Sequence, residues 1–63
     1  MNDEGFYQYF CAVMRRQGEV KLKNIAAAAN VSLPEARKSL NRLVKKGKIK
    51  KIGAGRSTAY TFL

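Results

Sequence analysis

The sequence predicts one α+β domain, with three helices, a short strand after the first of them, and a two-stranded hairpin at the C-terminal end. Two segments before Gly47 carry apolar residues at helical spacing, and a run of four alanines lies between them. After Gly47 the chain alternates apolar and polar residues around a glycine-rich loop, as the strands of a hairpin do. A chain of 63 residues leaves room for a single domain, residues 1–63.

The first helix is predicted over residues 4–17. Its apolar positions follow the i, i+4, i+7, i+8 spacing of a helix with one buried face: Phe6, Phe10, Val13 and Met14. Asn2 or Asp3 can cap its start, since a short polar side chain accepts a bond from the free N–H groups of the first turn. Gly18 suits the left-handed position that ends a helix.

A short strand is predicted over residues 20–22, where an apolar, a basic and an apolar residue alternate. The second helix is predicted over residues 23–29, built on Ile25 and the alanines. This segment has no good N-cap residue, so the position of its first residue stays open. Its small side chains would let it pack very close to the helices that cross it.

The third helix has clear signals at both ends. Ser32 and Glu35 have the S-x-x-E spacing of a capping box, and Pro34 falls in the first turn, where its missing N–H does no harm. Gly47 is predicted to end the helix. Its inward face is predicted to hold four apolar residues: Ala36, Leu40, Leu43 and Val44.

The hairpin is predicted from strands over residues 48–52 and 58–63, joined by a loop over residues 53–57. In the second strand, three residues share one face: Thr58, Tyr60 and Phe62. Ile49 and Ile52 cannot share a face, so we expect a bulge or an early strand end in the first strand.

Positive charge is concentrated in the second half of the chain. The net charge is +9 and the pI is about 10.2. Residues 1–31 hold four cations against three acids, a net charge of +1, whereas residues 32–63 hold nine cations against Glu35 alone, a net charge of +8. Like charges packed into half of a small domain repel one another, and a polyanion would relieve this repulsion. Nucleic acid is therefore the expected partner, and a solvated basic face without a partner is the alternative.

Several classes of protein are not expected from this composition. Cys11 is the only cysteine and histidine is absent, so no internal disulfide, metal site or cofactor is predicted, and Cys11 is interpreted as a helix-packing residue. The only adjacent carboxylates, Asp3 and Glu4, lie at a terminus, so we expect no enzyme. Without a secretory leader or an apolar run of membrane length, we expect no membrane partner and a cytoplasmic, nucleoid-associated location.

Four short segments carry a resemblance to a known superfamily: Ile25-Ala26, Ala29-Asn30-Val31-Ser32, Ala36-Arg37-Lys38-x-Leu40-x-Arg42-Leu43 and Lys46-Gly47-Lys48-Ile49. With the order of the elements, they resemble the winged helix-turn-helix superfamily, in which the terminal hairpin is called the wing. The closing Thr58-Ala59-Tyr60-x-Phe62-Leu63 is similar to the small fimbrial-operon regulators of the PapI/FaeA type. This resemblance implies a small transcriptional regulator that binds double-stranded DNA sequence-specifically.

The third helix is expected to enter the major groove, where its early residues reach base edges. The candidate base contacts are Pro34, Glu35, Arg37, Lys38 and Asn41. Glu35 has an alternative role in the capping box. The candidate backbone contacts lie at the helix ends and the base of the wing: Ser32, Arg42, Lys45, Lys46, Lys48, Lys50 and Lys51. The candidate wing contacts, at the backbone or in the minor groove, are Arg56, Ser57 and Thr58.

Other functions stay open at this point. The chain could be a winged-helix protein-interaction module, with Tyr7 and Tyr9 on the first helix as a partner surface. It could also bind nucleic acid with little sequence preference, including the Z form, although Arg37 and Asn41 stand where Z-DNA-binding Zα domains have Asn and Tyr. We expect a monomer or a weak homodimer. The other aromatic residues are predicted to be core: Phe6, Phe10, Tyr60 and Phe62.

Overall fold

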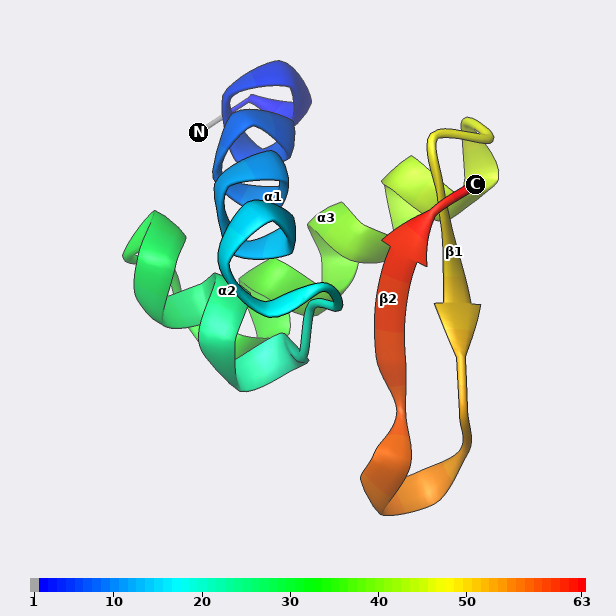
Figure 1. Cartoon of the computed structure of the whole chain (residues 1–63). Helices are drawn as coiled ribbons and strands as arrows, with labels where there is room; N and C mark the ends of the chain where they lie inside the picture. Colours follow the sequence, from blue (N-terminus) through cyan, green and yellow to red (C-terminus); the bar gives the residue numbers. More distant parts are fainter. Residues whose placement is uncertain (1) are drawn as a thin grey trace.

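The computed structural model describes residues 2–63 as three helices followed by a two-stranded antiparallel hairpin, as predicted. The elements in chain order are α1 (Asp3–Gln17), α2 (Leu22–Ala29), α3 (Leu33–Lys45), β1 (Ile49–Ile52), the 3₁₀ turn η1 (Gly55–Ser57) and β2 (Ala59–Phe62). The helices lie together on one side of the molecule, and the hairpin extends beside them with η1 at its tip (Figure 1). No helix within residues 2–63 is long and apolar enough to cross a bilayer.

The ends of α1 are capped as predicted. The Asn2 Oδ1 atom accepts a hydrogen bond of 2.7 Å from the Gly5 N–H, which satisfies one of the free donors of the first turn. Gly18 ends the helix in the left-handed conformation, with φ of 76°. Asp3 and Glu4 occupy the first turn, where negative charge is favoured by the helix dipole.

The strand predicted over residues 20–22 is wrong in extent, because the structure contains only a single β-bridge between Val20 and Tyr60. Its two backbone hydrogen bonds measure 2.8 and 2.7 Å between N and O. The chain turns into α2 directly afterwards, so Leu22 begins a helix one residue earlier than expected. Lys21 stands at the N-cap and makes no side-chain cap bond, in keeping with the weak start signal in the sequence.

The start of α3 is confirmed, since the Ser32 Oγ atom accepts from the Glu35 N–H at 3.2 Å. The prediction that Val44 faces inward was wrong, because this side chain is 37% exposed. At about 100° per residue, Val44 lies about 80° around the helix from Ala36 and reaches the rim of the buried face. Ser39 takes an inward position in its place and is buried.

The hairpin has four consecutive antiparallel pairs, from Ile49 opposite Phe62 to Ile52 opposite Ala59. The expectation of a bulge or an early strand end was therefore wrong, because β1 runs without interruption to Ile52. The two isoleucines differ in burial instead: Ile49 is in the core and Ile52 is half-buried. The second strand is shorter than predicted, because Thr58 and Leu63 fall outside it.

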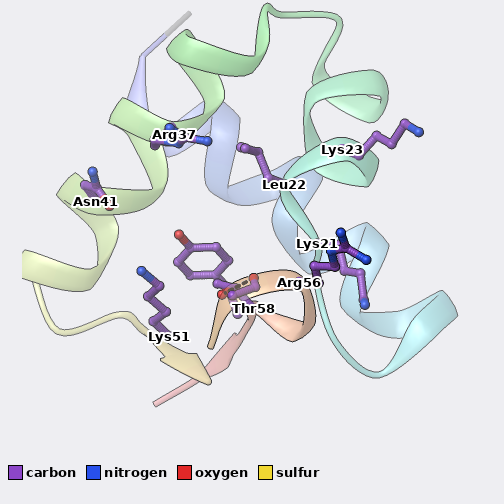
Figure 2. A pocket seen from close by; sticks show the side chains of 10 residues that line it. Lys21, Leu22, Lys23, Arg37, Asn41, Lys51, Arg56 and Thr58 are labelled. Carbon is purple, nitrogen blue, oxygen red and sulfur yellow. Dashed lines mark hydrogen bonds between the residues drawn. The ribbon is translucent and has the colours of Figure 1, made fainter. Parts of the chain in front are cut away.

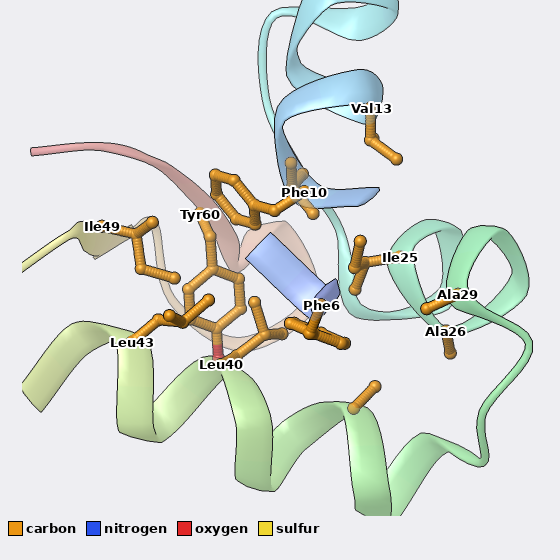
Figure 3. Packing of buried hydrophobic residues seen from close by; sticks show 12 residues of the cluster. Phe6, Phe10, Val13, Ile25, Ala26, Ala29, Leu40, Leu43, Ile49 and Tyr60 are labelled. Atoms are coloured by element: carbon orange, nitrogen blue, oxygen red, sulfur yellow. The ribbon is translucent and has the colours of Figure 1, made fainter. Parts of the chain in front are cut away.

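The core lies where the three helices meet β2 (Figure 3). Its largest members come from the three α-helices and both strands: Phe6 and Phe10 of α1, Ile25 of α2, Leu40 and Leu43 of α3, Ile49 of β1 and Tyr60 of β2. The core positions predicted for Phe6, Phe10 and Tyr60 are confirmed. Phe62 is 40% exposed, although its ring centroid lies 5.8 Å from that of Phe10.

The two valines at different depths give a test of this packing. Val13→Ala removes two methyl groups from a fully buried site, whereas Val44→Ala removes the same groups from a site that is 37% exposed. We expect the first change to lower the free energy of unfolding by about 2 kcal/mol and the second by less than about 1 kcal/mol, measured by urea denaturation. Both sites lie in helices, so replacing valine with alanine raises the helix propensity by the same amount in the two variants. Equal losses would contradict the rotation of α3 described above.

Candidate nucleic-acid interface

A basic cleft of about 500 Å³ lies between the start of α2, the middle of α3 and the hairpin (Figure 2). Its cations come from four parts of the chain: Lys21 and Lys23 at α2, Arg37 on α3, Lys51 on β1 and Arg56 in η1. Leu22, Asn41, Gly55, Thr58 and Tyr60 complete its lining. Within residues 2–63 no acidic side chain lines the cleft, so this concave surface concentrates positive potential.

On α3, the rotation of the helix decides which side chains face the cleft. Ala36, Leu40 and Leu43 are buried, and this places Arg37 and Asn41, one turn apart, beside the cleft. Lys38 and Lys45 lie on the outward side of the helix, opposite the buried residues, and both are exposed. The structure therefore brings four of the predicted α3 residues onto one continuous exposed face.

Pro34, Glu35 and Ser32 are exposed at the start of α3, beyond the cleft. Only half of the predicted capping box forms. Ser32 accepts from the Glu35 N–H, but within the described residues the Glu35 carboxylate does not return a bond to Ser32. The carboxylate of Glu35 is therefore not held by the helix cap.

The hairpin tip is shaped by its own hydroxyl groups. Ser57 Oγ donates to the Ala54 carbonyl and Thr58 Oγ1 donates to the Gly55 carbonyl, each at 2.9 Å. Gly53 has a φ of 74°, and a Cβ atom there would overlap the backbone carbonyl of Ser57. Ser57 and Thr58, predicted as wing contacts, thus hold the turn that presents Arg56, although their oxygens can still accept further bonds.

The basic residues of β1 divide between the two faces of the hairpin. Lys51 lines the cleft, whereas its neighbour Lys50 points to the opposite face, as successive residues of a strand do. Lys48 lies elsewhere, with its Nζ atom 5.4 Å from the centroid of the Tyr7 ring. The face of the Tyr7 ring attracts this cation, and burial raises the pKa of the Tyr7 hydroxyl.

Arg42 and Lys46, both predicted as backbone contacts, are paired with Asp3 of α1. The Arg42 Nε atom lies 3.0 Å from each Asp3 carboxylate oxygen, and its Nη2 atom lies 2.9 Å from Oδ1. Lys46 Nζ lies 3.0 Å from Oδ2. These hydrogen bonds, first from Arg42 and then from Lys46, lower the pKa of Asp3 to about 2. The same contact raises the pKa of Arg42.

Ten of the fifteen predicted contacts therefore fall into two groups. Arg37, Asn41, Lys51, Arg56 and Thr58 meet at the cleft, with Lys38 and Lys45 on the adjoining face of α3. Arg42, Lys46 and Lys48 lie near the start of α1 instead.

Sequence reasoning missed Lys21 and Lys23, which form the α2 side of the cleft. The sequence predicts a strand at Lys21, whereas in the structure Lys21 is the N-cap residue of α2 and lines the same cleft as Arg37. The uncapped start of α2, with two lysines around it, was the available signal. A pair of cations beside free helix N–H groups suits an anion.

Two comparisons with known proteins show the family and the fold of the chain. A model of the FaeA-like protein family matches residues 3–62. The crystal structure of the DIP2311 protein from Corynebacterium diphtheriae has a similar fold, with a TM-score of 0.84 and 19% sequence identity. The match covers 98% of this chain but only 11% of that much longer chain, so it shows the fold alone. No curated protein sequence matches the chain.

The Asp3 cluster makes stability depend on acid pH. The pKa of Asp3 is about 2 in the folded protein, below its ordinary value of 3.8. The ionised carboxylate therefore stabilises the fold above about pH 3.8, and this contribution is lost as the pH falls through about 2. We expect Asp3→Asn to flatten the decline of unfolding free energy over this range, measured by urea denaturation, whereas Glu4→Gln leaves it in place. If the free energy of unfolding of Asp3→Asn depended on pH as that of the wild type does, the stabilising role of the Asp3 carboxylate would be contradicted.

Proposed function

The chain belongs to the FaeA-like protein family of small winged-helix regulators, and we propose that it binds double-stranded DNA with sequence preference. The observation that carries this proposal is the cleft, where five cations from α2, α3 and the hairpin meet without an acidic neighbour among the described residues. Such a surface neutralises phosphates, and phosphate contacts supply most of the affinity for a duplex. In this proposal the protein acts as a transcriptional regulator in the cytoplasm, at the nucleoid.

The exposed face of α3 is proposed to lie in the major groove, which has the width to admit a helix. Arg37 and Lys38 can donate to guanine O6 and N7, and Asn41 can pair with adenine N6 and N7. Pro34 and Glu35, in the exposed first turn, would reach the bases from the other end of the helix, and Glu35 can accept from cytosine N4. Direct contacts of this kind distinguish one sequence from another.

The remaining cations of this surface are proposed to contact the backbone on either side of α3. Lys45 is the last residue of α3, Lys51 lies on the hairpin wall, and Lys21 and Lys23 lie on the α2 wall. Ser32, Lys48 and Lys50 lie outside the cleft and would reach phosphates only at the margins of the site. Arg56 at the hairpin tip can enter a narrow minor groove, where the negative potential of DNA is strongest.

Duplexes selected from a random pool provide the test, followed by shift assays across a range of salt. With about five to seven phosphates neutralised, log K should fall against log[salt] with a slope of roughly −4 to −6. Lys38→Ala with Asn41→Ala should reduce the preference for selected over random duplex by about tenfold or more, since each base contact contributes about 1–3 kcal/mol of discrimination. Arg56→Ala should weaken binding to both duplexes alike.

Arg15→Ala is the matched control, because Arg15 is an exposed cation of α1 that does not line the cleft. It should leave both affinities near wild type. An affinity that does not respond to salt, or all variants binding alike, would contradict the proposed function. Equal affinity of the wild type for selected and random duplex would replace it with nucleic-acid binding of little sequence preference.

A further inference from the structure

The cations of α3 and of its C-cap residue Lys46 are not equally available, because Asp3 binds two of them, Arg42 and Lys46. Arg42 and Lys46 lie one turn apart on the flank of α3 that faces α1, and both contact the same carboxylate at 2.9–3.0 Å. The Asp3 side chain is only 18% exposed, whereas Arg42 and Lys46 keep 50% and 53% exposure. The carboxylate is thus better shielded from solvent than the two cations that bind it.

Arg42 is also fixed in direction. Its Nη2 atom donates to Ser39 Oγ at 3.1 Å while its Nε atom is bound to the Asp3 carboxylate. A guanidinium held at both ends has fewer free donors for a phosphate than one that points into solvent. By contrast, none of the cleft cations makes an ion pair within the described residues.

We infer that Asp3 is a specificity determinant of the proposed DNA-binding site, acting as a built-in anion that withholds Arg42 and Lys46 from the phosphate backbone. This inference rests on the proposed function. A phosphate that approaches this flank must either compete with Asp3 for the two cations or lie beside its negative charge. Two cations and one acid then present a net charge of +1 where the unpaired cations would present +2.

The consequence concerns the ratio of specific to non-specific binding. Phosphate contacts add affinity for every sequence alike, whereas base contacts add it only for the right one. By lowering the charge on the flank of α3 away from the cleft, Asp3 reduces affinity for random duplex. It also favours an orientation in which DNA lies across the cleft side, where Arg37 and Asn41 face the bases.

Asp3→Asn and Glu4→Gln make a matched pair for the test. Each removes one negative charge from the first turn of α1, and Glu4 makes no ion pair within the described residues. With random-sequence duplex as the probe, Asp3→Asn should steepen the salt slope by about 1 to 2. The ratio of the Asp3→Asn affinity to the wild-type affinity should then be about three- to tenfold larger at about 50 mM salt than at about 200 mM salt. Glu4→Gln should change both quantities less than half as much.

Asp3→Asn and Glu4→Gln are then compared again in a protein that also carries Arg42→Gln and Lys46→Gln. This comparison tests whether Asp3 affects DNA binding through Arg42 and Lys46. If Asp3 acts through these two cations, its removal in that background should do no more than the removal of Glu4. An equal gain from Asp3→Asn in both backgrounds, or equal gains from the two acid variants in the wild type, overturns the inference.

A measurement on the wild type covers the case in which Asp3→Asn does not fold. On addition of random duplex, the Nε–H NMR signals of Arg37 and Arg56 should shift while that of Arg42 stays in place. A shift of Arg42 as large as that of Arg37 overturns the inference while leaving the proposed function intact. If the wild-type protein binds no duplex at any salt concentration, both the inference and the proposed function fail.

Discussion

Burial of the inner face of α3 is the constraint on which the rest of this structure depends. Ala36, Leu40 and Leu43 pack against residues of all the other helices and of β2, which fixes the rotation of α3 about its own axis. Because a helix has only one rotation that buries this stripe, the same packing decides where its polar residues point. Arg37 and Asn41 reach the cleft for this reason, and Arg42 and Lys46 turn toward α1.

Tyr60 links this helical core to the hairpin. Its side chain is buried beside α3, and its backbone pairs with Val20 on one side while it lies opposite Lys51 on the other. The hairpin is therefore anchored at the middle of β2, and its tip extends beyond the helices (Figure 1). One aromatic residue sets the separation between the α3 wall and the hairpin wall of the cleft, so core packing and the shape of the charged surface are not independent.

Much of the fold could be predicted because its signals are local. The Asn2 cap, the Ser32 cap and the left-handed Gly18 each depend on bonds within one helical turn, so the ends of α1 and α3 followed from short segments. The predictions that were wrong concern residues whose pairing or burial depends on contacts with distant segments of the chain. Val20 pairs for a single bridge before α2 begins, Val44 is turned to the rim by the packing of Leu40 and Leu43, and Phe62 stays partly exposed at the end of the short hairpin.

The sequence by itself determined that the chain has three helices and a basic hairpin, that it resembles its family, and that positive charge gathers in its second half. Periodicity, caps and net charge are properties of neighbouring residues, so they can be seen without coordinates. Only the tertiary structure decided how that charge is divided: Lys21 and Lys23 line the same cleft as Arg37, and Asp3 binds Arg42, 39 positions along the chain. Electrostatic contacts act over a few ångströms of space whatever the separation in sequence, so the folded core must place the charges before their partners can be known.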